Sequence, residues 1–346
     1  MKKCMLLFSI LALAAFAIGL VACGSDNEDK EADFGGMSPY CEACANAAPD
    51  PDSLEMDIPG EDENEKKVDV LTIGQLPIFY DMTVDISRVV NHYVLMHLGM
   101  LDEILSWPVT ENADGYCVWG PWIENGLSPV ETRFRMIKVE DNHFEYMWEQ
   151  RPKNTEEEFQ KVWYGEIFAT VGTNRRGTGS MTIDYDTASL LDPTIDASGV
   201  VDVVYDTVTD GREIQVTFND FDGEGTGVLT NGTYYYHNHL DNHGSFQYEY
   251  LDDIHKWMFL TNQPEAETVQ VETLWQTDGA GISTSYIDGG DIGETAWFDG
   301  KTVDHVEALE CWDSDFGRTY YRFQLYLQDG SDQALEEEGD EATCVY

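Results

Sequence analysis

The pattern of apolar and polar residues after Pro108 is that of β-strands. Short runs rich in Val, Ile, Thr, Tyr and Phe alternate with turn residues, and Asp210-Gly211 between two alternating runs is a strong β-hairpin signal. About twelve such runs predict a mainly β (α+β) protein, in which a long antiparallel meander forms a curved sheet or a barrel. The predicted strands are residues 132–139, 144–149, 162–171, 180–186, 200–205, 213–218, 232–239, 246–250, 268–274, 281–287, 303–309 and 319–327.

One predicted helix precedes these strands, and we expect it to pack on the sheet. Apolar side chains recur at roughly helical spacing over residues 82–107, with polar side chains between them. Pro108 ends the helix because proline lacks the N–H that a further turn needs. His92 and His97 are five residues apart and therefore lie on different helix faces. We interpret them as a polar-face and a core-margin histidine, not as a metal-binding pair.

A faint internal repeat runs through the strand region. Asp141-Asn142-His143 recurs as Asp241-Asn242-His243, and an aromatic-rich strand follows both copies. The offset of about one hundred residues predicts a duplicated unit of four to five strands, at about 130–187 and 230–291. We expect one β-rich domain from residue 71 to 346.

The N-terminus has a short positive region, Lys2 and Lys3, followed by an apolar run at residues 5–21 that suits a signal peptide. Leu20-Val21-Ala22-Cys23 then resembles the lipobox of bacterial lipoproteins. The resemblance implies that residues 1–22 are removed and that Cys23 carries fatty acyl chains such as palmitate, which anchor the protein to a membrane. Gly24, where Asp would favour the inner membrane, implies delivery to the outer membrane. Whether the protein faces the periplasm or the cell surface stays open.

Residues 23–70 are expected to be an acidic tether. Charge-dense stretches and prolines interrupt any regular element there, which is typical of disordered or loose chain. No second apolar run is long enough to span a bilayer. The chain has 66 acidic and 19 basic residues and a formal net charge of −47. Such a charge repels phosphates, so we expect no nucleic-acid partner and no electrostatic docking on anionic lipid.

Five cysteines follow Cys23, namely Cys41, Cys44, Cys117, Cys311 and Cys344. An exported protein meets an oxidising compartment, so disulfides are expected, and the odd number leaves at least one thiol unpaired within the chain. We predict a bridge between Cys311 and Cys344, which would fasten the C-terminal tail. We also predict a local bridge between Cys41 and Cys44, because this CxxC lacks the sequence context of a thioredoxin-type site or a zinc knuckle.

The sharpest candidate for chemistry is His237-Asn-His239-Leu-Asp241. HxH on a strand places two imidazoles on one face, about 6.5–7 Å apart along the strand. That spacing suits two ligands of one divalent metal, with Asp241 completing the shell. The alternative is a hairpin near the sheet rim in which these side chains serve turn geometry.

The chain has no GxSxG elbow, Walker lysine motif or HExxH motif, and no residue is assigned a catalytic role. One helix on a long antiparallel sheet resembles the architecture of periplasmic lipoprotein carriers and receptors. Our first hypothesis is a non-enzymatic, membrane-anchored lipoprotein with a binding or structural role in the cell envelope. The alternatives are a carrier of an apolar ligand in a half-barrel cavity, and a metal-binding protein or metalloenzyme that uses His237 and His239.

Overall fold

The computed structural model describes residues 39–60, 73–113, 115–122, 128–170, 175–209, 211–223, 225–227, 229–241, 243–252, 267–290, 292 and 297–344. The lipobox with Cys23, most of the signal and tether region, and Asp210 of the predicted hairpin lie outside the described residues. Among the described residues, no helix is both long and apolar enough to cross a membrane.

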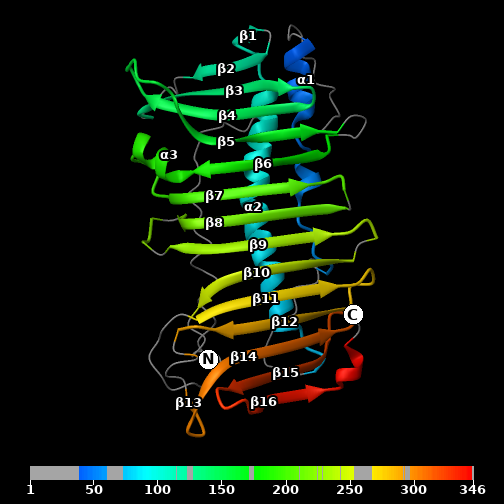
Figure 1. The fold of residues 1–346 in the computed structure, drawn as a ribbon. Coiled ribbons are helices and arrows are strands. Elements are labelled where there is room, and N and C mark those ends of the chain that lie inside the picture. The colour runs from blue at the N-terminus through cyan, green and yellow to red at the C-terminus, as the bar shows by residue number, and fades with distance from the viewer. Residues whose placement is uncertain are drawn as a thin grey trace. The chain divides into compact units, whose positions relative to one another are not determined.

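Fifteen strands form one antiparallel meander in chain order, and the sheet does not close into a barrel (Figure 1). A further short strand, β13 (Trp297–Phe298), lies off this path and pairs with β14. The predicted fold class is confirmed, in the form of an open sheet. The strands of the meander are β1 (Glu111–Ala113), β2 (Tyr116–Trp122), β3 (Val130–Glu140), β4 (His143–Pro152), β5 (Gln160–Ala169), β6 (Gly177–Asp184), β7 (Ser198–Asp206), β8 (Arg212–Asp222), β9 (Thr230–Asn238), β10 (Gly244–Asp252), β11 (Glu267–Trp275), β12 (Gly281–Asp288), β14 (Lys301–Trp312), β15 (Arg318–Leu327) and β16 (Asp332–Gly339).

Every predicted strand corresponds to a strand of the meander, and β1, β2, β13 and β16 were not predicted. The helical elements are α1 (Pro39–Ala47), η2 (Pro51–Leu54), α2 (Ile78–Ser106), α3 (Tyr185–Leu191) and η4 (Glu341–Thr343). The long helix α2 confirms the helix predicted at 82–107. It begins four residues earlier because Glu310 accepts a hydrogen bond from the backbone N–H of Phe79 over 2.8 Å, and so satisfies a free donor of the first turn.

The chain divides into two compact units. Unit 1 comprises Met1–Glu55, His92–Thr209 and Val216–Thr230, and unit 2 comprises Met56–Asn91, Asp210–Gln215 and Asn231–Tyr346. The first half of α2 therefore belongs to unit 2 and the second half to unit 1.

In unit 1, aromatic side chains fill the space between α2 and the strands. The ring of Tyr93 meets the rings of Phe218 and Phe221 edge-on, with centroids 6.2 and 5.5 Å apart. The ring of His97 packs against that of Trp163 at 5.5 Å. Burial of such rings stabilises the folded state of unit 1, by roughly 2–3 kcal/mol for each fully buried side chain relative to an exposed one.

In unit 2, α2 meets the sheet through both apolar and polar contacts. Tyr80 packs against Trp312 with ring centroids 5.2 Å apart. The hydroxyls of Thr83 and Thr273 lie 2.8 Å apart, and that of Ser283 lies 2.7 Å from Thr273. All three hydroxyl-bearing residues are buried, and the chain of hydrogen bonds satisfies polar groups that burial would otherwise destabilise.

Residues 39–60 are folded, which corrects their assignment to the tether. Cys41, Ala48, Leu54 and Met56 are buried, and α1 and η2 lie within this segment. Arg175 donates hydrogen bonds to the backbone carbonyls of Ala48 and Pro49 at 2.9 and 3.2 Å. The interpretation as loose chain was wrong here because small apolar residues among the prolines and acids find partners in distant parts of the sequence.

Candidate functional site

Three histidines at the β9–β10 hairpin form a stack of rings. The ring centroids of His237 and His239 are 3.8 Å apart, and those of His239 and His243 are 4.0 Å apart with planes 15° from parallel. The backbone N–H of His239 donates to the carbonyl of His243 over 2.9 Å, which closes the hairpin. The structure thus brings the predicted histidines together at a hairpin turn.

Two carboxylates lie beside this stack. Asp241 hydrogen bonds with the ring of His243, and Oε1 of Glu213 is 3.6 Å from Nε2 of His237. The described part of the chain contains no group of three or more His, Cys, Asp or Glu side chains that could hold a metal ion. A divalent metal at His237, His239 and Asp241 stays a prediction.

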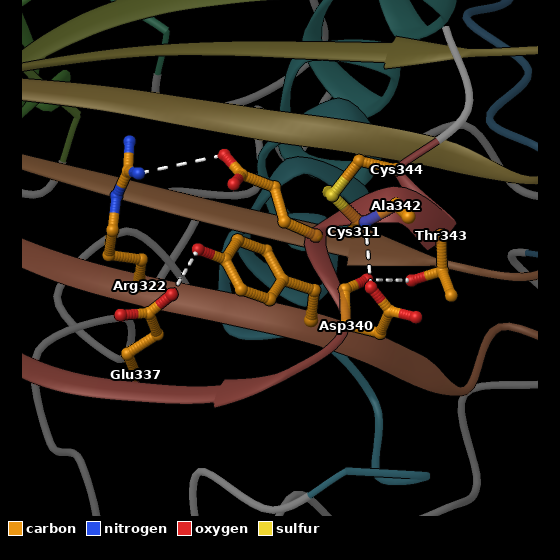
Figure 2. The surroundings of a disulfide bond; sticks show 9 residues. Cys311, Arg322, Glu337, Asp340, Ala342, Thr343 and Cys344 are labelled. Atoms are coloured by element: carbon orange, nitrogen blue, oxygen red, sulfur yellow. Dashed lines mark hydrogen bonds and ion pairs between the residues drawn. A yellow bond between two sulfur atoms is a disulfide. The ribbon is translucent and has the colours of Figure 1, made fainter.

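The predicted bridge between Cys311 and Cys344 is confirmed, with a Cα–Cα distance of 5.3 Å (Figure 2). It fastens the segment after β16 to β14. The turn beside it is closed by Asp340, whose side chain accepts from the N–H of Ala342 at 3.0 Å and whose carbonyl accepts from the Thr343 hydroxyl at 2.6 Å. The contacts around the bridge are those of a structural staple for the C-terminus.

The predicted bridge between Cys41 and Cys44 is wrong, because Cys41 is bonded to Cys117 on β2 and Cys44 is a buried free thiol. The reason is the docking of α1 on the sheet. The hydroxyl of Tyr40 donates to the carbonyl of Gly115 over 2.5 Å and accepts from a backbone N–H of β3. Burial raises the pKa of the Cys44 thiol to about 11, so this thiol stays protonated and unreactive at neutral pH.

A cluster of arginines on β3 and β4, which we call the arginine cluster, was not predicted. It consists of Glu131, Arg133 and Arg135 on β3, and of Glu149 and Arg151 on β4. Residues two apart on a strand share one face, and the register places Arg133 opposite Glu149 and Glu131 opposite Arg151. The side chains of the three arginines are 26–29 % exposed, so this face of unit 1 meets solvent.

The three guanidinium groups bind the two carboxylates unequally. Arg135 donates from Nε to Oε2 and from Nη2 to Oε1 of Glu149, both at 2.6 Å. Arg151 places Nε and Nη2 at 2.5 Å from Oε2 of Glu131. Among the residues that the structure describes, Arg133 bonds a carboxylate through Nε alone, at 2.7 Å from Oε2 of Glu149. Two guanidinium groups therefore use two nitrogens on a carboxylate of the chain, and the third uses one.

Glu149 is the buried centre of the arginine cluster, since its side chain is only 3 % exposed. Burial by itself would raise the pKa of this carboxyl. The hydrogen bonds and charges of Arg135 and Arg133 outweigh burial and hold the pKa of Glu149 below its ordinary value. Glu149 is thus an anion that fixes the two arginines in place.

Aromatic rings border the arginine cluster. The guanidinium carbons of Arg133 and Arg151 lie 4.0 and 4.4 Å from the ring centroid of Phe159, which is within the range of cation–π attraction. On β5, Lys161 stands opposite Glu149, and its ammonium lies 5.5 Å from the ring centroid of Tyr164. These rings restrict the cationic side chains further.

The sequence held a signal for this cluster. Glu131, Arg133 and Arg135 follow one another at the spacing of two that places strand residues on one face. Six of the chain's 19 basic residues lie between 133 and 161, in a protein with 66 acidic residues. What the sequence does not contain is the register, which decides which carboxylate faces which arginine.

Comparison with known proteins gives no relative of this chain. No protein-family model matches it, and neither a curated protein nor a solved structure is significantly similar to it.

Proposed function

We propose that this protein is a lipid-anchored protein of the cell envelope, with a binding or structural role at the membrane surface. The disulfide between Cys41 and Cys117 carries the proposal. Structural disulfides form and persist in oxidising compartments outside the cytoplasm. This agrees with the export that the lipobox ending in Cys23 implies, and the second bridge between Cys311 and Cys344 adds to it.

The position of the first disulfide shortens the link between anchor and body. Cys41 is eighteen residues after Cys23, and a chain of that length reaches at most about 60 Å when fully extended. The disulfide fixes Cys41 to β2 of unit 1. A lipid on Cys23 would therefore hold unit 1 near the membrane surface. The link between lipid and folded body is then eighteen residues long, whereas the expected tether of residues 23–70 has nearly fifty.

Contacts of α2 bear on the hypothesis of an apolar carrier. Such a carrier needs free space between the helix and the sheet. In unit 2 the rings of Phe79 and Phe323 lie 6.4 Å apart, and in unit 1 Tyr93 meets Phe221. Protein side chains occupy the space at both places, and no contact among the described residues favours a carrier over an anchored binding protein.

The proposal is tested by fatty-acid labelling of the full-length protein in bacterial cells. A clickable palmitate analogue should label the wild-type protein, which should pellet with membranes. Cys23→Ser should abolish both labelling and membrane association. Cys4→Ser is the matched control, because Cys4 lies in the peptide that we expect to be removed. Equal labelling of the Cys23→Ser protein and the wild type would refute the anchor.

A further inference from the structure

We propose that the arginine cluster is a binding site for a compact carboxylate, which Arg133 and Lys161 hold on the solvent side of β3–β5. The proposal goes beyond the membrane anchor and does not depend on it. It rests on the pairing of these side chains, their exposure and the distribution of charge around them.

Among the three arginines of the cluster, Arg133 is the one that uses a single nitrogen to bind a carboxylate. Arg135 and Arg151 each direct two nitrogens to a carboxylate of the chain, whereas only Nε of Arg133 bonds Glu149. The two terminal amino groups of Arg133 donate no hydrogen bond to any described residue. The side chain is 28 % exposed, so these donors are open to a ligand.

Lys161 adds a second available charge. The register aligns Arg133, Glu149 and Lys161 in one row across β3, β4 and β5, and neighbouring strands lie about 4.8 Å apart. The two cations are therefore about 10 Å apart at the backbone, with the buried anion between them. Lys161 is exposed and makes no ion pair with a described residue.

The ligand group that fits is a carboxylate. The planar fork of a guanidinium matches a planar carboxylate with two parallel hydrogen bonds. The pairing of Arg135 with Glu149 already uses this geometry on the same surface. With Arg151 and Lys161 counted, four cations face two glutamates, so the cluster keeps a positive charge for an incoming anion.

The surrounding charge limits the size of the ligand. Glu156, Glu157 and Glu158 precede Phe159 and are exposed, and the whole chain carries a formal net charge of −47. The backbone carbonyl of Glu157 accepts from Nη1 of Arg151 over 3.5 Å, so these acids border the cluster and favour an anion compact enough to stay between Arg133 and Lys161. A long polyanion would extend over acidic surface and be repelled.

Calorimetric titration of the detergent-solubilised full-length protein tests the proposal. Glucuronate and N-acetylglutamate α-amide each present one carboxylate, on a sugar and on an amino-acid side chain, and glucose is the neutral match for the sugar acid. We expect at least one of the two carboxylates to bind with millimolar or tighter affinity. The compound that binds more tightly shows whether the site prefers a sugar acid or an acidic side chain. Glucose should not bind, and 1 M NaCl should weaken binding severalfold.

The variants separate this site from the general charge of the protein. Arg133→Gln and Lys161→Met should each weaken binding at least tenfold. Lys161→Met removes no ion pair to a described residue, so it retains the fold even if Arg133→Gln perturbs Glu149. Arg322→Gln is the matched control, because Arg322 is a similarly exposed arginine on β15, paired with Glu341, and should leave binding unchanged.

Three results would overturn the proposal. One is the absence of binding by both carboxylates. Another is binding that Lys161→Met and Arg133→Gln leave intact or that Arg322→Gln weakens equally. The third is tighter binding of a DNA duplex or polyphosphate than of either compact carboxylate. None of these results bears on lipidation of Cys23, which the labelling experiment tests separately.

Discussion

Glu310 and Arg318 form an ion pair of 2.6 Å in which both side chains are fully buried. Glu310 also accepts from the N–H of Phe79 at the start of α2, and Arg318 reaches the carbonyl of Leu76 at 3.3 Å. The pair therefore joins β14 and β15 to the chain segment that begins α2. Replacing one residue of such a pair by a neutral one leaves the other charge buried without an opposite charge beside it.

We expect Glu310→Gln to lower the free energy of unfolding by about 3–5 kcal/mol. Glutamine keeps an acceptor for the N–H of Phe79. The decrease in the free energy of unfolding therefore measures the cost of leaving the charge of Arg318 without its carboxylate. The double variant Glu310→Leu/Arg318→Met should be less destabilised than Glu310→Gln alone, because it buries no charge. Urea unfolding of the three proteins measures this. A loss below about 1 kcal/mol in Glu310→Gln would contradict the assignment.

Gly281 and Trp312 give a second prediction. They are opposite each other on β12 and β14, and a Cβ at position 281 would lie 2.4 Å from Cζ2 of Trp312 and 2.3 Å from the carbonyl oxygen of Leu274. Gly281→Ala should therefore destabilise the protein by about 1–3 kcal/mol through overpacking.

Gly99 provides the matched control for this substitution. It lies within α2, and a Cβ at this position would have no neighbouring atom within 4 Å outside the local helix backbone. Gly99→Ala should stabilise the protein by about 0.5–1 kcal/mol, because alanine loses less backbone entropy in a helix. Thermal unfolding of both variants decides the point, and a stabilised Gly281→Ala protein would show that Trp312 does not cover the glycine.

Much of this fold follows from alternation along the chain, since a strand with one buried face has a period of two that its own sequence shows. The edge strand β16 has no such period. All eight of its residues are exposed, and it is a strand only because its backbone pairs with β15. The start of α2 depends on Glu310, 231 residues away from Phe79, and no local pattern encodes that contact. The same limit applies to the arginine cluster, whose residues are visible in the sequence but whose pairing is not.

His97 gives a pH dependence with a defined sign. Burial, partly offset by its hydrogen bond to the Tyr93 carbonyl, lowers the pKa of His97 to about 4 from an ordinary value of 6.5. Its stabilising contribution is complete above pH 6.5. As the pH falls from 6.5 to 4, the unfolded chain binds a proton that the folded protein does not, so stability is lost, with no further loss below pH 4.

Between pH 7 and pH 5 this effect should cost roughly 2 kcal/mol. His97→Leu should remove that component of the pH dependence, as followed by urea unfolding at the two pH values. His92→Leu is the control, because His92 is exposed on the same helix and is only a minor cause of the lowered pKa of His97, so this variant should keep most of the wild-type dependence. Equal pH dependence in His97→Leu and wild type would show that His97 is not the group responsible.

The two cysteines of α1 should differ in their effect on stability. The bridge between Cys41 and Cys117 closes a separation of 76 residues, for which the chain-entropy relation gives about 4 kcal/mol. Cys41→Ala should lose stabilisation of that order. Cys44→Ala removes only a buried thiol and should cost about 1 kcal/mol. The reverse order in a denaturant titration would indicate that Cys44 is the bonded residue.

Peptide mapping by mass spectrometry, without reduction, of the protein extracted from membranes tests the central proposal most directly. We expect a peptide that begins at Cys23 and carries fatty acyl chains, together with a cross-linked peptide pair that joins Cys41 to Cys117. Both features in one molecule would establish an exported body held close to the membrane. An unmodified Cys23 within an uncleaved N-terminus, or free thiols at both Cys41 and Cys117, would contradict it.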